Sequence, residues 1–227
     1  MMILQRIIAA FLLSFTLIGP GFAESSKLRV LVMGDSLMAV NRMAGASVAQ
    51  ALADDLGVSV KDHSMLGARY FHILPISGAA GMRIDAQLRG GPWDYVVING
   101  GGNDLLFGCG CGACTKMMNR LIAADGATGA IPRMVADIRA TGAKVIYTGY
   151  LRTPGVESPV ESCGPVGDEL DRRLLQLAER DSGFRFLRLS DLVTQDGDRS
   201  YHGVDMVHPS VKGSRAIADK VAALIGE

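Results

Sequence analysis

Short apolar runs alternate with segments of helical periodicity along the chain. The first apolar run, Leu28 to Met33, is rich in β-branched residues and ends at Gly34-Asp35-Ser36, so it predicts a buried strand that leads into a turn. Further strands are predicted at Val58–Val60, Tyr95–Ile98, Lys144–Thr148 and Phe184–Leu187. Because helical segments lie between these runs, we expect an α/β fold with a mainly parallel sheet covered on both faces.

Apolar residues at helical spacing predict what connects the strands. After Ser36, apolar side chains recur every four residues and predict one amphipathic helix through Val40, Ala44, Val48 and Leu52. The same periodicity predicts helices around Ile131–Ile138, Leu170–Leu177 and Ile217–Leu224. In a parallel sheet, ligands bind at the carboxyl ends of the strands, and functional residues are expected there.

Composition limits the class of protein. The 227 residues suit a single domain with a full core, and 48% apolar against 20% charged residues is globular composition. Lysine plus arginine total 23 and aspartate plus glutamate total 23, so no basic excess favours binding to nucleic acid.

The first residues are typical of an export signal. Arg6 precedes an apolar stretch from Ile7 to Ile18, and small residues at Gly21 and Ala23 suit a signal peptidase. We therefore predict a signal peptide at 1–23, a single domain at 24–227 and a periplasmic or secreted protein without a membrane span after cleavage. An uncleaved membrane anchor is the alternative, although the run is shorter than the ~20 residues of a spanning helix.

Two polar motifs suggest nucleophilic catalysis. Ser36 lies at a predicted strand-to-helix turn, where its hydroxyl is exposed, although serine there could also simply cap the helix. Near the other end, Asp205 and His208 form a D-x-x-H pattern, in which the carboxylate can orient an imidazole that acts as base near neutral pH.

Two glycine-containing motifs follow the second and third predicted strands. Gly101-Gly102-Asn103-Asp104 comes after the strongest strand, and the Asn103 amide could donate to an oxyanion. An ordinary capped turn is the alternative for this motif. Gly67, after the second strand, could contribute a backbone amide.

These motifs resemble the blocks of the SGNH (GDSL-type) esterase and lipase superfamily, in the same order from Gly34 to Pro209. The resemblance implies a flavodoxin-like three-layer α/β/α fold with a five-stranded sheet, and hydrolysis of acyl esters without metal or organic cofactor. It implies a triad of Ser36, His208 and Asp205. It also implies an oxyanion hole of Ser36, Gly67 and Asn103. The family often has an asparagine at the start of the second block, where this chain has Asp62 and His63.

The four cysteines suggest disulfides. Cys109, Cys111 and Cys114 cluster after the Asn103 motif, and Cys163 stands apart. In an exported protein, an even count favours one bond inside the cluster and one to Cys163, with the pairing open. A redox pair at Cys111 and Cys114 and a zinc site of four thiolates are the alternatives.

Several interpretations compete. His202 lacks a carboxylate at D-x-x-H spacing, so we expect a structural or substrate-lining role for it. His63 and His72 are expected to be surface residues or satisfied polar residues. Residues 70–82 and 151–165 follow strand ends and could form pocket walls, or belong to the core.

Partners are expected to be small-molecule, lipid or glycan acyl esters. Alternative functions are acyl transfer to a sugar, non-catalytic binding and thiol redox chemistry.

Overall fold

One parallel sheet organises the chain. The computed structural model describes residues 27–153, 157–193 and 198–227, so the predicted signal peptide and its cleavage site lie outside the described residues. The strands are β1 (Val30–Met33), β2 (Val60–Asp62), β3 (Tyr95–Ile98), β4 (Lys144–Thr148) and β5 (Phe184–Leu187). They run parallel in the order β2-β1-β3-β4-β5, which confirms the predicted five-stranded sheet.

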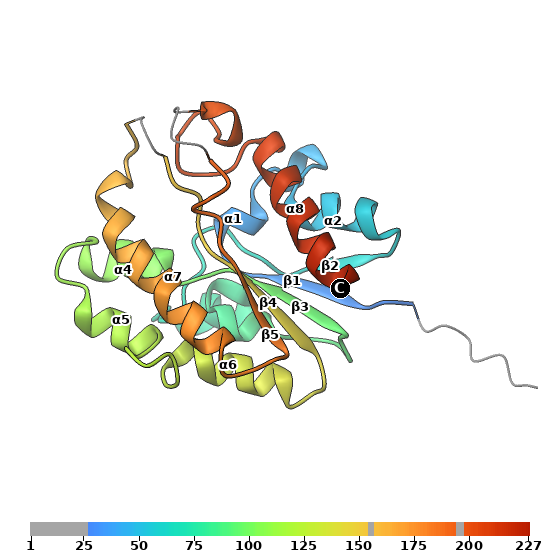
Figure 1. Ribbon diagram of the computed structural model, residues 1–227, viewed down its shortest axis with the longest axis horizontal. Coiled ribbons are helices and arrows are strands. Elements are labelled where there is room, and N and C mark those ends of the chain that lie inside the picture. Colours follow the sequence, from blue (N-terminus) through green and yellow to red (C-terminus); the bar gives the residue numbers. More distant parts are fainter. Residues whose placement is uncertain (1–26, 154–156, 194–197) are drawn as a thin grey trace, which may run out of the picture.

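Helices cover both faces of the sheet (Figure 1). One face carries α1 (Ser36–Ala39), α2 (Val48–Leu56) and α8 (Val211–Gly226). The other carries α4 (Gly102–Cys109), α5 (Thr115–Leu121), α6 (Ala130–Arg139) and α7 (Gly164–Ala178). Shorter helices are η1 (Arg42–Ala44), α3 (Pro75–Ser77), η2 (Gly78–Met82), η3 (Ile84–Gln87), η4 (Glu161–Cys163) and η5 (Arg199–Tyr201). Within the described ranges, no helix combines the length and apolar character needed to cross a membrane.

Successive side chains along each strand point to opposite faces of the sheet, so the core has two layers. In β1, Val30 and Val32 pack against α1, α2 and α8, whereas Leu31 and Met33 pack against α4 to α7. All four side chains are fully buried. Because both faces of the strand are covered, its sequence is a continuous apolar run, which made β1 easy to predict.

The prediction of one continuous helix after Ser36 is wrong. Helix α1 ends at Ala39 after about one turn. Asn41 and Gly45 then adopt left-handed backbone conformations that interrupt a helix. Helix α2 starts anew after Ser47, which forms a reciprocal capping box with Gln50. Periodicity alone missed these breaks because apolar residues continue at four-residue spacing through them.

The second strand begins two residues later than predicted. Gly57 ends α2 in a left-handed conformation, and β2 pairs with β1 from Val60 to Asp62 instead of occupying Val58–Val60. This strand lies at the sheet edge and is only partly buried, so hydrophobicity is a weak guide to its position.

Candidate active site

Ser36 occupies a tight turn at the carboxyl end of β1. Gly34 has a φ of 138°, and a Cβ there would lie 2.5 Å from the Asn99 carbonyl oxygen, so only glycine fits. Asp35 is the N-cap of α1, and its carboxyl accepts a 3.0 Å hydrogen bond from the Leu37 amide. Ser36 is therefore the first residue of the helix, and the alternative in which it serves as the cap is wrong. Its side chain is partly exposed and makes no hydrogen bond to another described residue.

Asp205 and His208 form a close pair on the loop before α8. His208 Nδ1 lies 2.6 Å from Asp205 Oδ2, and Asp205 Oδ1 accepts hydrogen bonds of 3.0 Å from the Val207 and His208 amides. Partial burial acts to raise the pKa of Asp205, but these hydrogen bonds outweigh it and lower the pKa to about 2. The ionised carboxylate thus engages Nδ1 and leaves Nε2 of His208 available for other contacts.

One cavity brings the two ends of the chain together. Ser36, Gly67, Asn103 and His208 all line a cavity of about 610 Å³. His208 is also near enough to act electrostatically on Asp35, beside the serine. No hydrogen bond joins Ser36 to His208 in the part of the chain that the structure describes. Because both residues line this cavity, the serine and the imidazole lie at the same edge of the sheet.

The Asn103-Asp104 pair holds the Gly67 segment in place. Asn103 Nδ2 donates a 3.1 Å hydrogen bond to the Ala68 carbonyl, and buried Asp104 accepts 2.9 Å bonds from the Tyr70 and Phe71 amides. Gly67 has a φ of 74°, which disfavours any other residue. The asparagine retains a second N–H, because an amide nitrogen carries two.

Two residues that the sequence analysis missed brace this site. Tyr150 Oη donates a 2.6 Å hydrogen bond to Asp35 and accepts one of 2.8 Å from the Gly102 amide. Buried Gln87 bonds both backbone groups of Gly34, at 2.6 and 2.9 Å. Burial raises the pKa of Asp35 to about 6, against the opposing effects of Tyr150 and the Leu37 amide. Neither Tyr150 nor Gln87 belongs to a recognisable motif.

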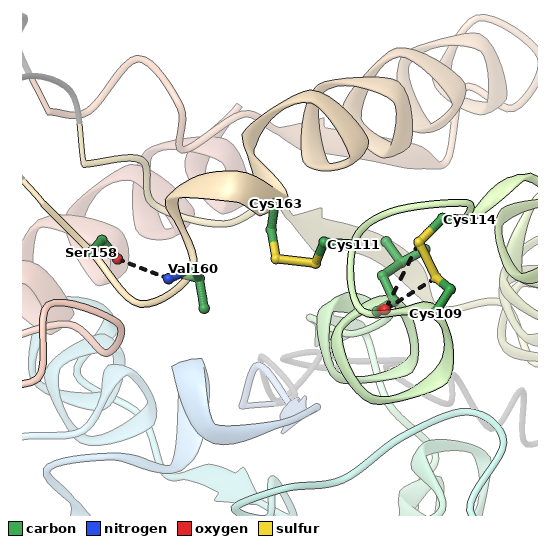
Figure 2. The surroundings of a disulfide bond; sticks show 7 residues. Cys109, Cys111, Cys114, Ser158, Val160 and Cys163 are labelled. Carbon is green, nitrogen blue, oxygen red and sulfur yellow. Dashed lines mark hydrogen bonds between the residues drawn. A yellow bond between two sulfur atoms is a disulfide. The ribbon is translucent and has the colours of Figure 1, made fainter.

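The cysteines form two disulfides, Cys109–Cys114 and Cys111–Cys163 (Figure 2). One bond lies inside the cluster and the other reaches Cys163, as predicted. The second bond joins the segment after α4 to the residue before α7, and both its cysteines line the cavity. With all four sulfurs paired, the zinc interpretation is wrong, and so is a redox bond between Cys111 and Cys114.

The remaining histidines differ in position. His202 is buried in the cavity wall, neither ring nitrogen bonds a described residue, and burial lowers its pKa. His63 Nδ1 contacts the Gln87 carbonyl and His72 Nε2 contacts Ser77 Oγ, each at 2.8 Å, and neither histidine lines the cavity of Ser36.

The two predicted pocket walls have different outcomes. The segment 151–165 contributes Leu151, Val160 and Cys163 to the cavity of Ser36. The segment 70–82 does not line it: Tyr70 is buried in the core, as the alternative predicted, whereas Ile73 and Ile76 are exposed.

Comparison with known proteins agrees with this architecture. Residues 32–216 match the model of the GDSL-like Lipase/Acylhydrolase family, and the chain belongs to this family of hydrolases. The fold is that of the SGNH hydrolases. No curated protein sequence matches the chain.

Three solved structures illustrate the shared fold. A member of the lipolytic protein G-D-S-L family from Veillonella parvula DSM 2008 has a TM-score of 0.63 at 14% identity, covering 88% of this chain and 99% of that one. A carbohydrate acetylesterase from Sinorhizobium meliloti has a TM-score of 0.53 at 22% identity, covering 87% and 100%. A family two carbohydrate esterase from Clostridium thermocellum, in complex with cellohexaose, has a TM-score of 0.57 at 18% identity, covering 88% and 63%.

Proposed function

We propose that this protein is an exported serine hydrolase that cleaves acyl esters with Ser36, His208 and Asp205. The observation that carries the proposal is the shared cavity, in which a serine at a strand-to-helix turn faces the same space as an imidazole held by a carboxylate 2.6 Å away. A serine hydroxyl needs an adjacent base to become nucleophilic, and this pair supplies one.

The reaction follows from the roles of these groups. Ser36 Oγ attacks the ester carbonyl while His208 Nε2 accepts its proton, and the imidazolium then protonates the departing alcohol. A water molecule then gives a proton to His208 as its oxygen attacks the acyl carbonyl, and the imidazolium returns this proton to Ser36 Oγ as the acyl–oxygen bond breaks and the acid leaves. Asp205 stays ionised throughout and stabilises the imidazolium. The amides of Ser36 and Gly67 and the side chain of Asn103 would stabilise the tetrahedral oxyanion.

The cavity wall favours a substrate with an apolar acyl group. Its lining is mostly hydrophobic and includes Leu66, Leu105, Leu106, Phe107, Val160, Val166 and Leu170. Burying an acyl chain there is favourable by about 0.8 kcal/mol per methylene. We therefore expect medium-length acyl esters to be turned over better than acetyl esters. Acyl transfer to a sugar would use the same residues and differs only in the acceptor.

The disulfides support export. Such bonds persist in oxidising compartments and are rare in the cytosol. Together with the predicted signal peptide at 1–23, they favour a periplasmic or secreted enzyme.

Covalent labelling tests the proposal. A fluorophosphonate should modify Ser36, as located by peptide mass spectrometry, and Ser36→Ala should lose both label and hydrolysis of p-nitrophenyl butyrate while its circular dichroism stays native. Ser182→Ala, at an exposed serine, is the matched control and should keep both. Unchanged turnover in Ser36→Ala, or a label on another serine, would remove the proposal. Product analysis with an added sugar acceptor separates hydrolysis from transfer.

A further inference from the structure

Three apolar side chains project from the segment before η2. Ile73, Leu74 and Ile76 are 83%, 60% and 89% exposed. The segment is nevertheless held in shape, because His72 Nε2 contacts Ser77 Oγ at 2.8 Å and the Gly78 amide donates to the Leu74 carbonyl at 2.8 Å. An ordered backbone that presents several large apolar side chains to water marks a contact surface.

Arginines lie beside these side chains. A second cavity, of about 440 Å³, is lined by Ile73 together with Arg69, Arg83 and Arg120. Arg83 pairs with Asp85, whereas Arg69 and Arg120 have no ion pair with a described carboxylate. Their guanidinium groups instead lie over aromatic rings, Arg120 at 3.9 Å from the centroid of Phe71 and Arg69 at 5.7 Å from that of Phe107.

Among the described residues, one carboxylate lines this second cavity, and it already accepts hydrogen bonds from backbone amides. Asp104 accepts hydrogen bonds from the Tyr70 and Phe71 amides, and burial raises its pKa against the opposing effects of these amides and of the Arg69 charge. The cavity therefore keeps an excess of positive charge. Planar guanidinium groups without a carboxylate partner are suited to bind phosphate oxygens.

This surface adjoins the Ser36 cavity through Phe107. Phe107, which stacks under Arg69, lines the Ser36 cavity, as does Leu66. Both are well exposed, at 66% and 60%. We name the surface formed by Leu66, Arg69, Ile73, Leu74, Ile76, Phe107 and Arg120 the apolar-basic rim.

We propose that the apolar-basic rim docks the enzyme onto the surface of anionic lipid aggregates. Ile73, Leu74 and Ile76 enter the acyl region, while Arg69 and Arg120 contact headgroup phosphates. Apolar side chains flanked by cations are the combination that binds an anionic lipid surface, through buried area and electrostatic attraction together. A lipid surface is favoured over a protein partner because exposed apolar side chains and cationic charge occur together, with Ile73 in the wall of the same cavity as Arg69 and Arg120. The inference goes beyond ester hydrolysis, and docking needs no catalysis.

Vesicle binding tests it in the catalytically silent Ser36→Ala background. The full chain should sediment with phosphatidylglycerol-containing vesicles at least tenfold more strongly than with phosphatidylcholine vesicles. Adding Ile73→Ser and Ile76→Ser should weaken sedimentation at least tenfold. Adding Arg69→Gln and Arg120→Gln instead should abolish the preference for anionic lipid and its sensitivity to salt. Any contribution of residues 1–23 to vesicle binding is the same in all variants.

Matched controls lie on α8, on the opposite face of the sheet. Val211→Ser removes an exposed apolar side chain and Lys220→Gln an exposed charge, and the two together should leave vesicle binding unchanged. Equal binding by the rim variants and the parent would overturn the proposal. So would a change from dimer to monomer in the Ile73→Ser, Ile76→Ser protein without loss of vesicle binding, which would identify a self-association surface. With Ser36 restored, the rim variants should hydrolyse soluble p-nitrophenyl butyrate normally, so that a failure of docking is distinguished from a failure of the proposed hydrolase.

Discussion

The hydroxyl of Tyr150 donates a 2.6 Å hydrogen bond to the buried carboxyl of Asp35, 115 residues earlier in the chain. The same oxygen accepts the Gly102 amide, one residue before Asn103. A single phenol thereby connects the turn that carries the proposed nucleophile to the helix that carries the proposed oxyanion donor. Their relative position depends on this oxygen.

Tyr150→Phe should weaken both catalysis and stability. It leaves the Gly102 amide and Asp35 without their partner, which costs about 1–3 kcal/mol for a buried group. A small displacement of Ser36 relative to Asn103 should lower kcat by roughly ten- to hundredfold with little change in KM. Ester hydrolysis and urea unfolding measure the two effects. Tyr95→Phe, which removes a hydroxyl bonded to the Ile225 carbonyl, is the control and should keep wild-type kcat. Wild-type kinetics in Tyr150→Phe would contradict this role.

Asp35 should make the stability depend on pH. Its pKa rises from 3.8 in the unfolded chain to about 6 in the folded protein, so the folded state binds more protons between these values. The free energy of unfolding should therefore fall as pH rises from 4 to 6, by about 2 kcal/mol from this group. Asp35→Asn removes that contribution.

Urea unfolding at acidic and neutral pH measures the effect. The deficit of Asp35→Asn relative to wild type should be larger at pH 4 than at pH 7 by about 2 kcal/mol. Asp191→Asn, at an exposed carboxyl, is the control for the loss of a carboxylate as such. A constant difference for Asp35→Asn would show that its carboxyl titrates normally.

Asp205→Asn should lower kcat by about 10²–10⁴ while the protein stays folded, because an amide fixes the wrong imidazole tautomer. Steady-state hydrolysis of p-nitrophenyl butyrate measures the loss. Since the pKa of Asp205 is about 2, a wild-type loss of activity near pH 5 should not come from this carboxyl. Nearly full activity of Asp205→Asn would exclude the proposed triad.

The two disulfides should contribute unequally. Cys111 and Cys163 are 52 residues apart and Cys109 and Cys114 only five, so loop closure predicts about 4 and about 2 kcal/mol of stabilisation. Replacing each pair by serine and comparing urea unfolding tests the order. The variant in which serine replaces Cys111 and Cys163 should also lose activity, because both residues line the Ser36 cavity. Equal stability losses would contradict the loop-length argument.

Local patterns in the sequence were sufficient for most of the sheet. The bounds of β3, β4 and β5 agree with their apolar runs, and Asp205 and His208 were recognisable because their contact spans only three residues. Interactions between distant segments left no comparable pattern. The Tyr150–Asp35 bond is one such case, and the cysteine pairing is another, because spacing alone allows three arrangements.

The loop of Asp205 and His208 is largely self-contained. The Asp205 carboxylate receives its hydrogen bonds from the Val207 and His208 amides as well as from the imidazole, all within four consecutive residues. Most of the cavity wall that would select the acyl group comes from other parts of the chain, notably α4 and residues 151–153 and 160–164, with Met206 and Val207 as the contribution of this loop. Substitutions in those walls could therefore change the chain-length preference while the hydrogen bond between Asp205 and His208 is kept.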